Sequence, residues 1–221
     1  MKIVAISDTH QLHNKITVPL WDVLLHCGDF TNKGTSGALK DFLEWFSSQP
    51  HEHKIFIAGN HELGLDRGPM RDRKLAIIKG FMEKHPNLHY LENSEVTVGG
   101  VKFYGSPITP WFFDWAWNVR RGAPIAAAWD LIPEDTQVLL THGPAYGILD
   151  TVLESFGRDS HQGCADLRER IKKLSSLKLH AFGHLHLEGG QTLAEDGVTF
   201  ANAAICDDAY HTVHPPIEVE I

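Results

Sequence analysis

The stretch KIVAISDTH, at residues 2–10, decides how the rest of the chain is read. An apolar run of strand length ends there in Asp8 and His10, which are two residues apart. In extended backbone such residues project to the same side, so a carboxylate and an imidazole converge at the strand's end. Both groups are common metal ligands. A single pair is weak evidence, so other strand ends must be compared with it.

Four further apolar runs end in side chains of the same kinds. Residues 22–29 end in Asp29, residues 54–58 lead to Asn60 and His61, residues 137–141 precede His142, and residues 179–182 lead to His184 and His186. In open α/β sheets ligands bind at the carboxyl ends of the strands, so these groups can meet in one place. They offer more ligands than one ion needs, which favours a dinuclear hydrolytic centre.

The remaining elements are predicted from hydrophobic spacing. Leu39, Phe42, Leu43 and Phe46 recur with helical period after Thr35 or Ser36, either of which can cap the helix. Two more helices are expected over residues 73–85 and 164–177, a hairpin around residues 99–100, and closing strands at 198–204 and 217–220. Strands and helices alternate in the first half, which indicates parallel pairing. We find no repeat or linker and expect one domain over residues 1–221.

Composition excludes several classes of protein. The net charge is −8 with histidine neutral, and no block of basic residues is present, which argues against a non-specific nucleic-acid binder or a membrane-surface protein. No apolar run approaches the roughly 18 residues of a membrane span. Three widely spaced cysteines and the absence of a signal-like N-terminal stretch indicate a cytoplasmic protein. Fifteen histidines are a high number and hint at metal chemistry.

The segment from residue 107 to residue 122 contains five aromatic rings without helical or strand period. We expect a loop that folds onto itself or over a pocket. Trp111 and Phe112 are candidates for stacking on the base or aryl group of a substrate. The alternative, a buried packing cluster, carries equal weight because aromatic residues pack into cores as readily as they line pockets.

The motifs D-x-H at residue 8, GD at 28, GNHE at 59, THG at 141 and GHxH at 183 resemble the five motifs of the calcineurin-like metallophosphoesterase superfamily. They occur in the family's order and span nearly the whole chain. The flanking segments LHCGDFT at 25–31, PWF at 110–112, GC at 163–164 and NAA at 202–204 are similar to the small metallophosphoesterase-domain-containing branch, near the class III cyclic-nucleotide phosphodiesterases.

The resemblance implies an α/β fold: a four-layer sandwich of two mixed β-sheets flanked by helices. It also implies two divalent or transition metal ions (Mn, Fe, Zn or Mg, with Mn favoured). Asp8, His10 and His186 would hold the first ion, Asn60, His142 and His184 the second, and Asp29 both. A metal-bound hydroxide would attack phosphorus. His61, counted with Asn60 among the catalytic residues, would donate a proton to the leaving oxygen.

The expected function is metal-dependent hydrolysis of a small phosphoester, possibly a nucleotide, with phosphodiesters favoured. A phosphomonoesterase or protein phosphatase with the same centre is the first alternative, and a non-catalytic interaction module on this fold is the second. Two roles remain open for Glu62 and Asn14: each either orients a metal ligand or caps a helix. His26 is assigned to the core, and His180 is expected to be a surface residue or a hydrogen-bonded core residue. Neither the oligomeric state nor the natural substrate follows from the sequence.

Overall fold

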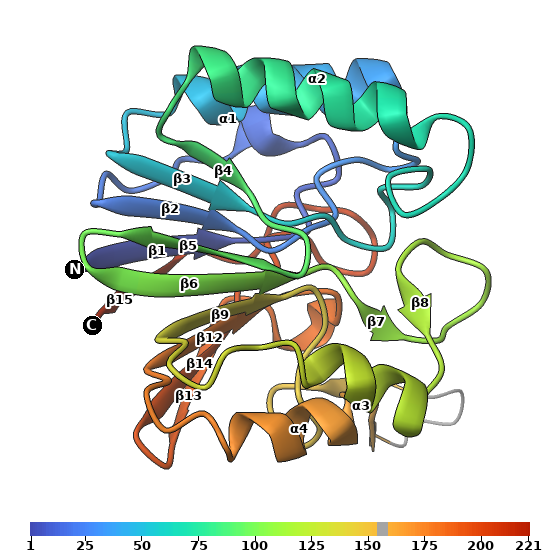
Figure 1. The fold of residues 1–221 in the computed structure, drawn as a ribbon, viewed down its shortest axis with the longest axis vertical. Helices are drawn as coiled ribbons and strands as arrows, with labels where there is room; N and C mark the ends of the chain where they lie inside the picture. The colour runs from blue at the N-terminus through green and yellow to red at the C-terminus, as the bar shows by residue number, and fades with distance from the viewer. Residues whose placement is uncertain (154–158) are drawn as a thin grey trace.

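The computed structural model describes residues 1–153 and 159–221, and two β-sheets packed face to face form its centre (Figure 1). The first sheet has the order β15-β1-β2-β3-β4. Its strands are β1 (Lys2–Ile6), β2 (Val23–His26), β3 (His53–Phe56), β4 (Leu88–Tyr90) and β15 (Ile217–Glu220). Only β15 runs antiparallel to its neighbour, β1. The parallel strands therefore end at a common edge.

The second sheet has six strands in the order β13-β14-β12-β9-β6-β5. They are β5 (Ser94–Val98), β6 (Val101–Ser106), β9 (Val138–Thr141), β12 (Leu179–Phe182), β13 (Gln191–Glu195) and β14 (Val198–Asn202). The middle strands β6, β9, β12 and β14 are parallel, and both outer strands are antiparallel. Two short pairs, β7 (Thr109–Pro110) with β8 (Asn118–Val119) and β10 (Thr151–Leu153) with β11 (Asp159–His161), lie outside these sheets.

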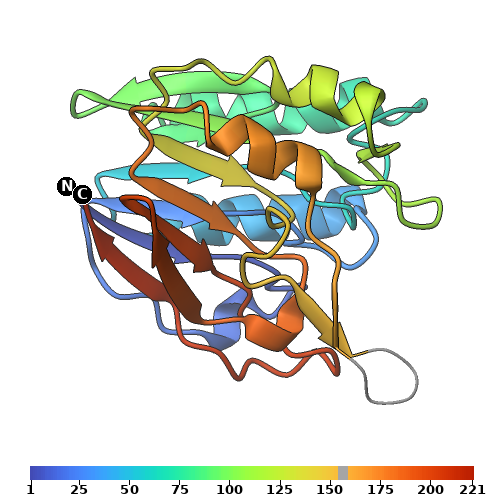
Figure 2. The ribbon, with the colours of Figure 1, turned by 90° about the horizontal axis from the view of Figure 1, so that it is seen from below.

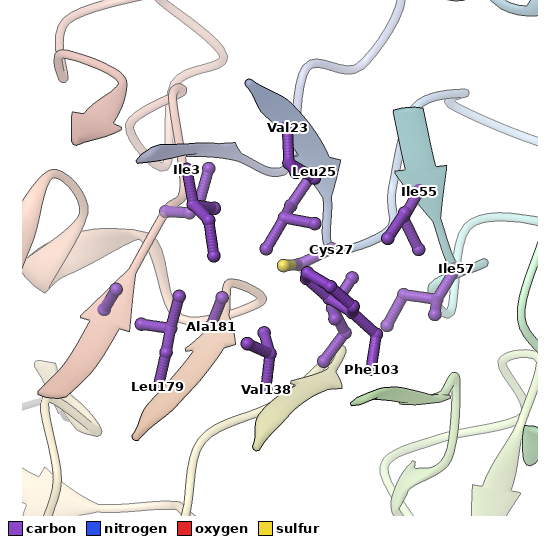
Figure 3. Packing of buried hydrophobic residues seen from close by; sticks show 14 of the residues in the cluster. Ile3, Val23, Leu25, Cys27, Ile55, Ile57, Phe103, Val138, Leu179 and Ala181 are labelled. Atoms are coloured by element: carbon purple, nitrogen blue, oxygen red, sulfur yellow. The ribbon is translucent and has the colours of Figure 1, made fainter. Parts of the chain in front are cut away.

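The two sheets bury their inner faces against each other. Leu25 and Ile55 come from the first sheet, and Phe103, Leu140 and Ala181 come from the second, all fully buried in one cluster (Figure 3). Side chains on these faces alternate with others that point outward, as the period of a strand requires. Burying an aliphatic or phenyl side chain contributes about 1.5–3 kcal/mol, so this interface is the main core that holds the sheets together.

Helices cover the outer face of each sheet, which gives the four layers (Figure 1). Helices α1 (Ser36–Ser48) and α2 (Arg71–Lys84) lie over the first sheet, and α3 (Ala123–Trp129) and α4 (Ala165–Ile171) lie over the second. A second hydrophobic cluster lies between the first sheet and its helices and includes Phe42 of α1. A third lies between the second sheet and its helices and includes Trp129 of α3. The predicted α/β sandwich of two mixed sheets flanked by helices is confirmed.

The helix predictions differ from the structure at their ends. Thr35 is the cap of α1, since its hydroxyl accepts a hydrogen bond from the N–H of Ala38. Helix α2 begins two residues before the predicted residue 73. Helix α4 ends at Ile171 rather than at 177, because the next turn tightens: the N–H of Leu174 bonds to the carbonyl of Ile171. The sequence did not predict α3, whose seven residues are too short to show a period.

The termini lie side by side at one end of the sandwich (Figure 2), where the amino group of Met1 donates to the carbonyl of Ile221. The carboxyl ends of β1, β2 and β3 point to the opposite end. Among the described residues, no helix combines the length and apolar character that crossing a membrane requires.

Candidate metal centre

The loops that follow β1, β2 and β12 turn sharply as they reach the centre. Asp8, His10, Asp29 and His184 all have left-handed backbone, with φ of 52°, 43°, 55° and 69°. This conformation is uncommon for residues other than glycine and costs roughly 1–3 kcal/mol when the surrounding structure imposes it. Backbone bonds impose it here: the N–H of Asp8 donates to the carbonyl of Gly28, and that of His10 donates to the carbonyl of Asp29. Strain of this kind is typical of functional sites.

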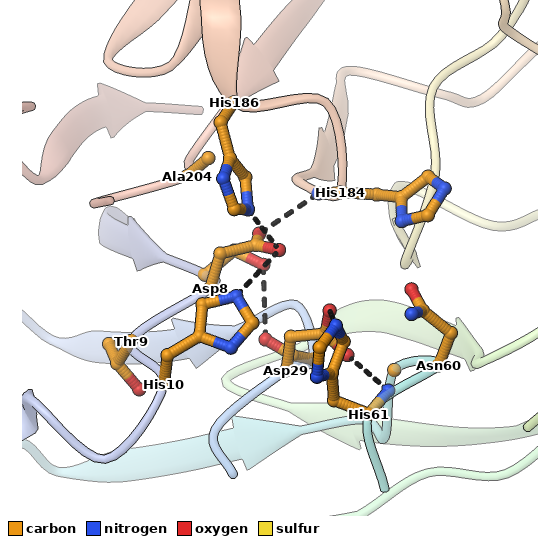
Figure 4. Close-up of polar contacts among 12 residues, drawn as sticks. Asp8, Thr9, His10, Asp29, Asn60, His61, His184, His186 and Ala204 are labelled. Carbon is orange, nitrogen blue, oxygen red and sulfur yellow. Dashed lines mark hydrogen bonds and ion pairs between the residues drawn. The ribbon is translucent and has the colours of Figure 1, made fainter. Parts of the chain in front are cut away.

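The candidate ligands form three overlapping clusters, in each of which the ligand atoms lie within 4.8 Å of one another (Figure 4). They are Asp8 with His10 and His186, His10 with Asp29 and His61, and Asp29 with His142 and His184. The side chains of Asp8, His10, Asp29 and His142 are buried. His10 and Asp29 each belong to two clusters, and Asp29 is the carboxylate that joins His10 to His142 and His184.

The orientation of His142 indicates a cation between its ring and its neighbours. Its Nδ1 lies 2.9 Å from the carbonyl oxygen of Cys27, which can only accept, so Nδ1 carries the proton. In the neutral ring Nε2 then has a lone pair. That lone pair faces Oδ1 of Asn60 at 2.8 Å and Oδ2 of Asp29 at 3.2 Å. Three electron-rich atoms converging in a buried place require a proton or a metal ion among them.

His186 and His61 are held in the same manner. Nδ1 of His186 donates to the carbonyl of Asp207, and Nδ1 of His61 donates to the carbonyl of Asn32. Backbone carbonyls commonly fix metal-binding histidines in this way, and in both residues the bond leaves Nε2 free for a metal ion or a proton. Nε2 of His186 lies 3.3 Å from Oδ1 of Asp8. His10 has two buried ring nitrogens with no hydrogen-bond partner in the described part of the chain, which fits a role as a metal ligand.

The electrostatics agree with this interpretation. Burial alone would raise the pKa of Asp8 and Asp29, but neighbouring imidazoles, His186 for Asp8 and His142 for Asp29, hold both pKa values well below the usual range. Burial opposes charge on His142, yet Asp29 and Asp8 raise its pKa to about 9. The pKa of His184 falls to about 3, through burial first and the charge of His142 second. The pair of buried carboxylates thus attracts positive charge, which bound cations can supply.

A sequence model of the calcineurin-like phosphoesterases matches residues 1–188 of the chain. The chain belongs to this family. Metallophosphoesterase domain-containing protein 1 of Homo sapiens is 40% identical over 234 residues, which cover 100% of this chain and 71% of the human protein. UPF0046 protein K07C11.7 of Caenorhabditis elegans is 39% identical over 223 residues, which cover 98% of this chain and 74% of that protein. The family performs metal-dependent phosphoester hydrolysis, as the motifs predicted.

Two solved structures share the fold of this phosphoesterase. The protein TT1561 of Thermus thermophilus aligns with a TM-score of 0.60 at 15% identity and covers 91% of this chain and 88% of its own. The phosphopantetheinyl hydrolase PptH of Mycobacterium tuberculosis aligns with a TM-score of 0.55 at 16% identity and covers 92% of this chain and 89% of its own. At such identities the likeness supports the architecture alone.

Glu62 joins two ligand-bearing loops of the phosphoesterase. Its buried carboxylate accepts hydrogen bonds from the N–H of Asp29 at 2.9 Å, from the N–H of Gly59 at 2.6 Å and from both the N–H and the hydroxyl of Thr31 at 2.9 Å. Burial and, after it, the charge of Asp29 raise the pKa of Glu62 to about 8. Of the two roles left open by the sequence, orientation of the loops around Asn60 and Asp29 is the one that the geometry supports. Asn14, on the short helix η1 (His13–Lys15), is not among the described residues that donate to this carboxylate.

His61 is fixed on both faces of its ring. Trp115 stacks on one side with centroids 4.4 Å apart, and His10 meets the ring edge-on at 4.8 Å. The backbone N–H of His61 donates to Oδ1 of Asp29 at 2.8 Å, and the ring Nε2 of His61 lies 3.9 Å from Oδ2 of Asp29. The ring therefore points its free nitrogen into the centre.

The aromatic loop contributes exposed rings beside the centre. Trp111 and Phe112 are 59% and 53% exposed, so the buried packing cluster does not describe them. Both line a cavity of about 480 Å³ that also reaches His184, Pro144 and Leu185. The N–H of Ala116 donates to the carbonyl of Asn60, which ties the loop to the ligands.

Sequence reasoning missed two residues at the centre, Trp115 and Tyr210. The ring of Tyr210 meets His10 edge-on with centroids 4.6 Å apart, and it lines the same cavity as Asp29 and His186. Tyr210 comes from a segment near the end of the chain that carries no motif, so only the folded path could bring it here. Trp115 could have been inferred from its position in the aromatic loop, but the sequence does not say which ring would meet His61.

Proposed function

We propose that this calcineurin-like phosphoesterase is a phosphodiesterase with a dinuclear metal centre in which Asp29 is shared. The family supports metal-dependent phosphoester hydrolysis. The observation that carries the two-ion assignment is the membership of Asp29 in two ligand clusters, one with His10 and one with His142.

Two of the clusters overlap the ligand sets proposed from the motifs, and the third adds His61, which is proposed here as a proton donor. Asp8, His10 and His186 would hold the first ion, and Asn60, His142 and His184 would hold the second, with Asp29 between them. Manganese is favoured, while iron, zinc and magnesium suit the same mixture of imidazole and carboxylate ligands. Two such ions would supply Lewis acidity for the phosphate oxygens and lower the pKa of a bound water.

The chain's own residues would hold and protonate the substrate. His61 keeps a hydrogen on Nδ1 through the carbonyl of Asn32, and its Nε2 can hold the proton that the leaving oxygen needs. The amide of Asn60 lies 2.8 Å from His142, where it can orient a phosphate oxygen as well as bind metal. Glu62 keeps both loops in register through its backbone bonds.

The substrate would be a small phosphoester such as a nucleotide. The exposed rings of Trp111 and Phe112 beside His184 support this preference, because such rings stack on planar groups. A long polyanion is disfavoured by the net charge of −8. Residues 1–221 would act as one catalytic domain, and the three free cysteines suit the reducing cytoplasm.

A rate panel after metal removal tests this proposal. The chelated protein should be inactive, and readdition of each candidate ion should restore hydrolysis of bis(p-nitrophenyl) phosphate and cyclic nucleotides more than of p-nitrophenyl phosphate. A consistent preference for the monoester would replace the diesterase assignment by a phosphomonoesterase. Failure of every ion to restore activity on any ester would support the non-catalytic alternative.

A further inference from the structure

Three cavities at the centre share lining residues and are together named the groove here. The middle one, of about 230 Å³, is lined by Asp29 and Asn60. It shares Phe112 and His184 with the cavity of about 480 Å³ on one side. It shares His61, Trp115 and Tyr210 with a cavity of about 470 Å³ on the other side. The two outer cavities share no lining residue. The centre thus has two arms, as the two ester groups of a phosphodiester require.

The first arm, here named the aromatic cavity, is lined by Pro110, Trp111, Phe112, Pro144, Val152 and Leu185 among others. Its rings are presented by a fixed loop: the side-chain amide of Asn118 donates to the carbonyls of Phe112 and Phe113. Among the described residues that line it, Arg121 carries a permanent charge, and its guanidinium donates to the carbonyls of Gln162 and Gly163. Because hydrogen bonds hold this loop in place, its exposed rings are positioned to stack on a planar apolar group.

The second arm, here named the His61 cavity, is more varied in chemistry. It is lined by His10, Leu12, Asn32, Lys33, His61 and Trp115 together with Tyr210. The ring of His61 is fixed by the backbone carbonyl of Asn32 and by the stack of Trp115. It lines this arm and the middle cavity but not the aromatic cavity.

We infer that the groove fixes which ester bond is cut: the group retained on phosphorus lies in the aromatic cavity, and the leaving alcohol lies in the His61 cavity. This inference rests on the proposed phosphodiesterase function. A leaving oxygen must come within hydrogen-bond reach of its proton donor, about 2.6–3.2 Å. His61 lines the second arm and does not line the aromatic cavity, so the leaving alcohol is assigned to the His61 cavity. The substrate class is a diester of a planar aromatic alcohol or nucleoside with a second alcohol.

The step balances as a hydrolysis. The oxygen of water forms a bond to phosphorus, and the bond from phosphorus to the leaving oxygen breaks with its electron pair. The leaving oxygen takes a proton from Nε2 of His61, and one proton of the attacking water replaces it. The products are the free second alcohol and the phosphomonoester of the aromatic alcohol.

A pair of esters with one common leaving group tests the assignment. Methyl p-nitrophenyl phosphate and phenyl p-nitrophenyl phosphate both release p-nitrophenolate and differ only in the retained group. In Trp111→Ala the advantage of the phenyl ester over the methyl ester in kcat/KM should fall about five-fold or more, as expected for loss of one stacked ring. Phe113→Ala is the matched control, since Phe113 is a 68% exposed ring of the same loop that lines none of the three cavities. It should leave the ratio unchanged.

An equal loss for both esters in Trp111→Ala would overturn the inference, because it would place the leaving nitrophenyl ring in the aromatic cavity. No loss for either ester would overturn it too. Calorimetry adds a readout without turnover: Trp111→Ala should weaken binding of phenyl phosphate about five-fold or more and leave binding of methyl phosphate unchanged. If wild type hydrolyses neither ester, the phosphodiesterase proposal fails, whereas the calorimetric result still decides whether the aromatic cavity accepts a planar group.

Discussion

The two sheets contribute different chemistry to the same centre. The strand ends of the first sheet supply every carboxylate of the three clusters, Asp8 and Asp29, along with His10 and His61. The strand ends of the second sheet supply imidazoles alone, His142, His184 and His186. The negative charge that would attract cations therefore belongs to one half of the molecule, and the other half contributes imidazoles without a carboxylate.

This asymmetry predicts unequal effects of substitution. Loss of a shared carboxylate should affect both proposed ions, whereas loss of one imidazole should affect one. The two outer layers differ as well: α1 and α2 have 13 and 14 residues, while α3 and α4 have seven each. The half that holds the charge is thus also the half with the longer helices behind it.

The largest effect is expected at Asp29. Asp29→Ala should lower kcat/KM for phosphodiesters by about 10⁴-fold or more, because two ions supply several kcal/mol of charge stabilisation and both would lose a ligand. Asp130→Ala, which removes an exposed acid in the other half, is the control and should have wild-type kinetics. A loss below about ten-fold in Asp29→Ala would remove the asymmetry between the sheets.

His61→Ala should lower the rate by about 10²–10⁴-fold for poor leaving groups and keep the metal content, since general acid catalysis contributes that much. The loss should shrink for p-nitrophenolate, which leaves without protonation. Steady-state rates over a series of leaving groups, with metal analysis of the same sample, check both statements. If His61→Ala hydrolysed alkyl esters at the rate of the wild type, the role given to His61 would be contradicted.

A smaller effect is expected at Glu62, which accepts hydrogen bonds from the backbone of the first sheet's loops and is not itself a proposed metal ligand. Glu62→Gln keeps the shape but removes one acceptor from a carboxylate with four donors. Metal affinity should fall by about 10–100-fold, as for other residues that orient ligands. Competition with a chelator measures this change. Unchanged affinity would mean that the backbone bonds of Asp29 and Gly59 need no such partner.

Two histidines placed alike in the two sheets allow a comparison without metal. His26 on β2 lies 3.0 Å from the hydroxyl of Thr9, and His180 on β12 lies 2.7 Å from that of Thr141. Burial lowers the pKa of each to about 3. The unfolded chain binds a proton at each histidine near pH 6.5, and the folded chain does so only near pH 3. Both residues therefore make stability fall as the pH drops through this window.

The smallest effect follows from this pair. His180→Leu should reduce the slope of unfolding free energy against pH between pH 6.5 and about 3 by up to about 1.4 kcal/mol per pH unit, the value for one proton. Denaturant unfolding at several pH values measures the slope. A slope equal to that of wild type would mean that His180 is protonated in the folded state.

Much of the centre could be predicted from the sequence because strand ends of parallel sheets meet at one edge. That rule is enough to group Asp8, Asp29 and His142, although they are far apart in the chain. It could not find Tyr210 or the stack of Trp115 on His61, because those contacts depend on loop paths that no local pattern encodes. The assignment of His26 to the core is confirmed by its burial against Phe42, and of the two roles left open for His180, burial beside Phe182 supports the core one. The metal roles of the ligands stay a prediction.

The most direct test of the central claim is the metal content of four proteins prepared in parallel. We predict about two ions per chain in wild type, about one in His186→Ala and in His184→Ala, and close to none in Asp29→Ala, because Asp29 is the one ligand that the proposed assignment gives to both ions. One tightly bound ion in wild type, undiminished in Asp29→Ala, would contradict the dinuclear centre.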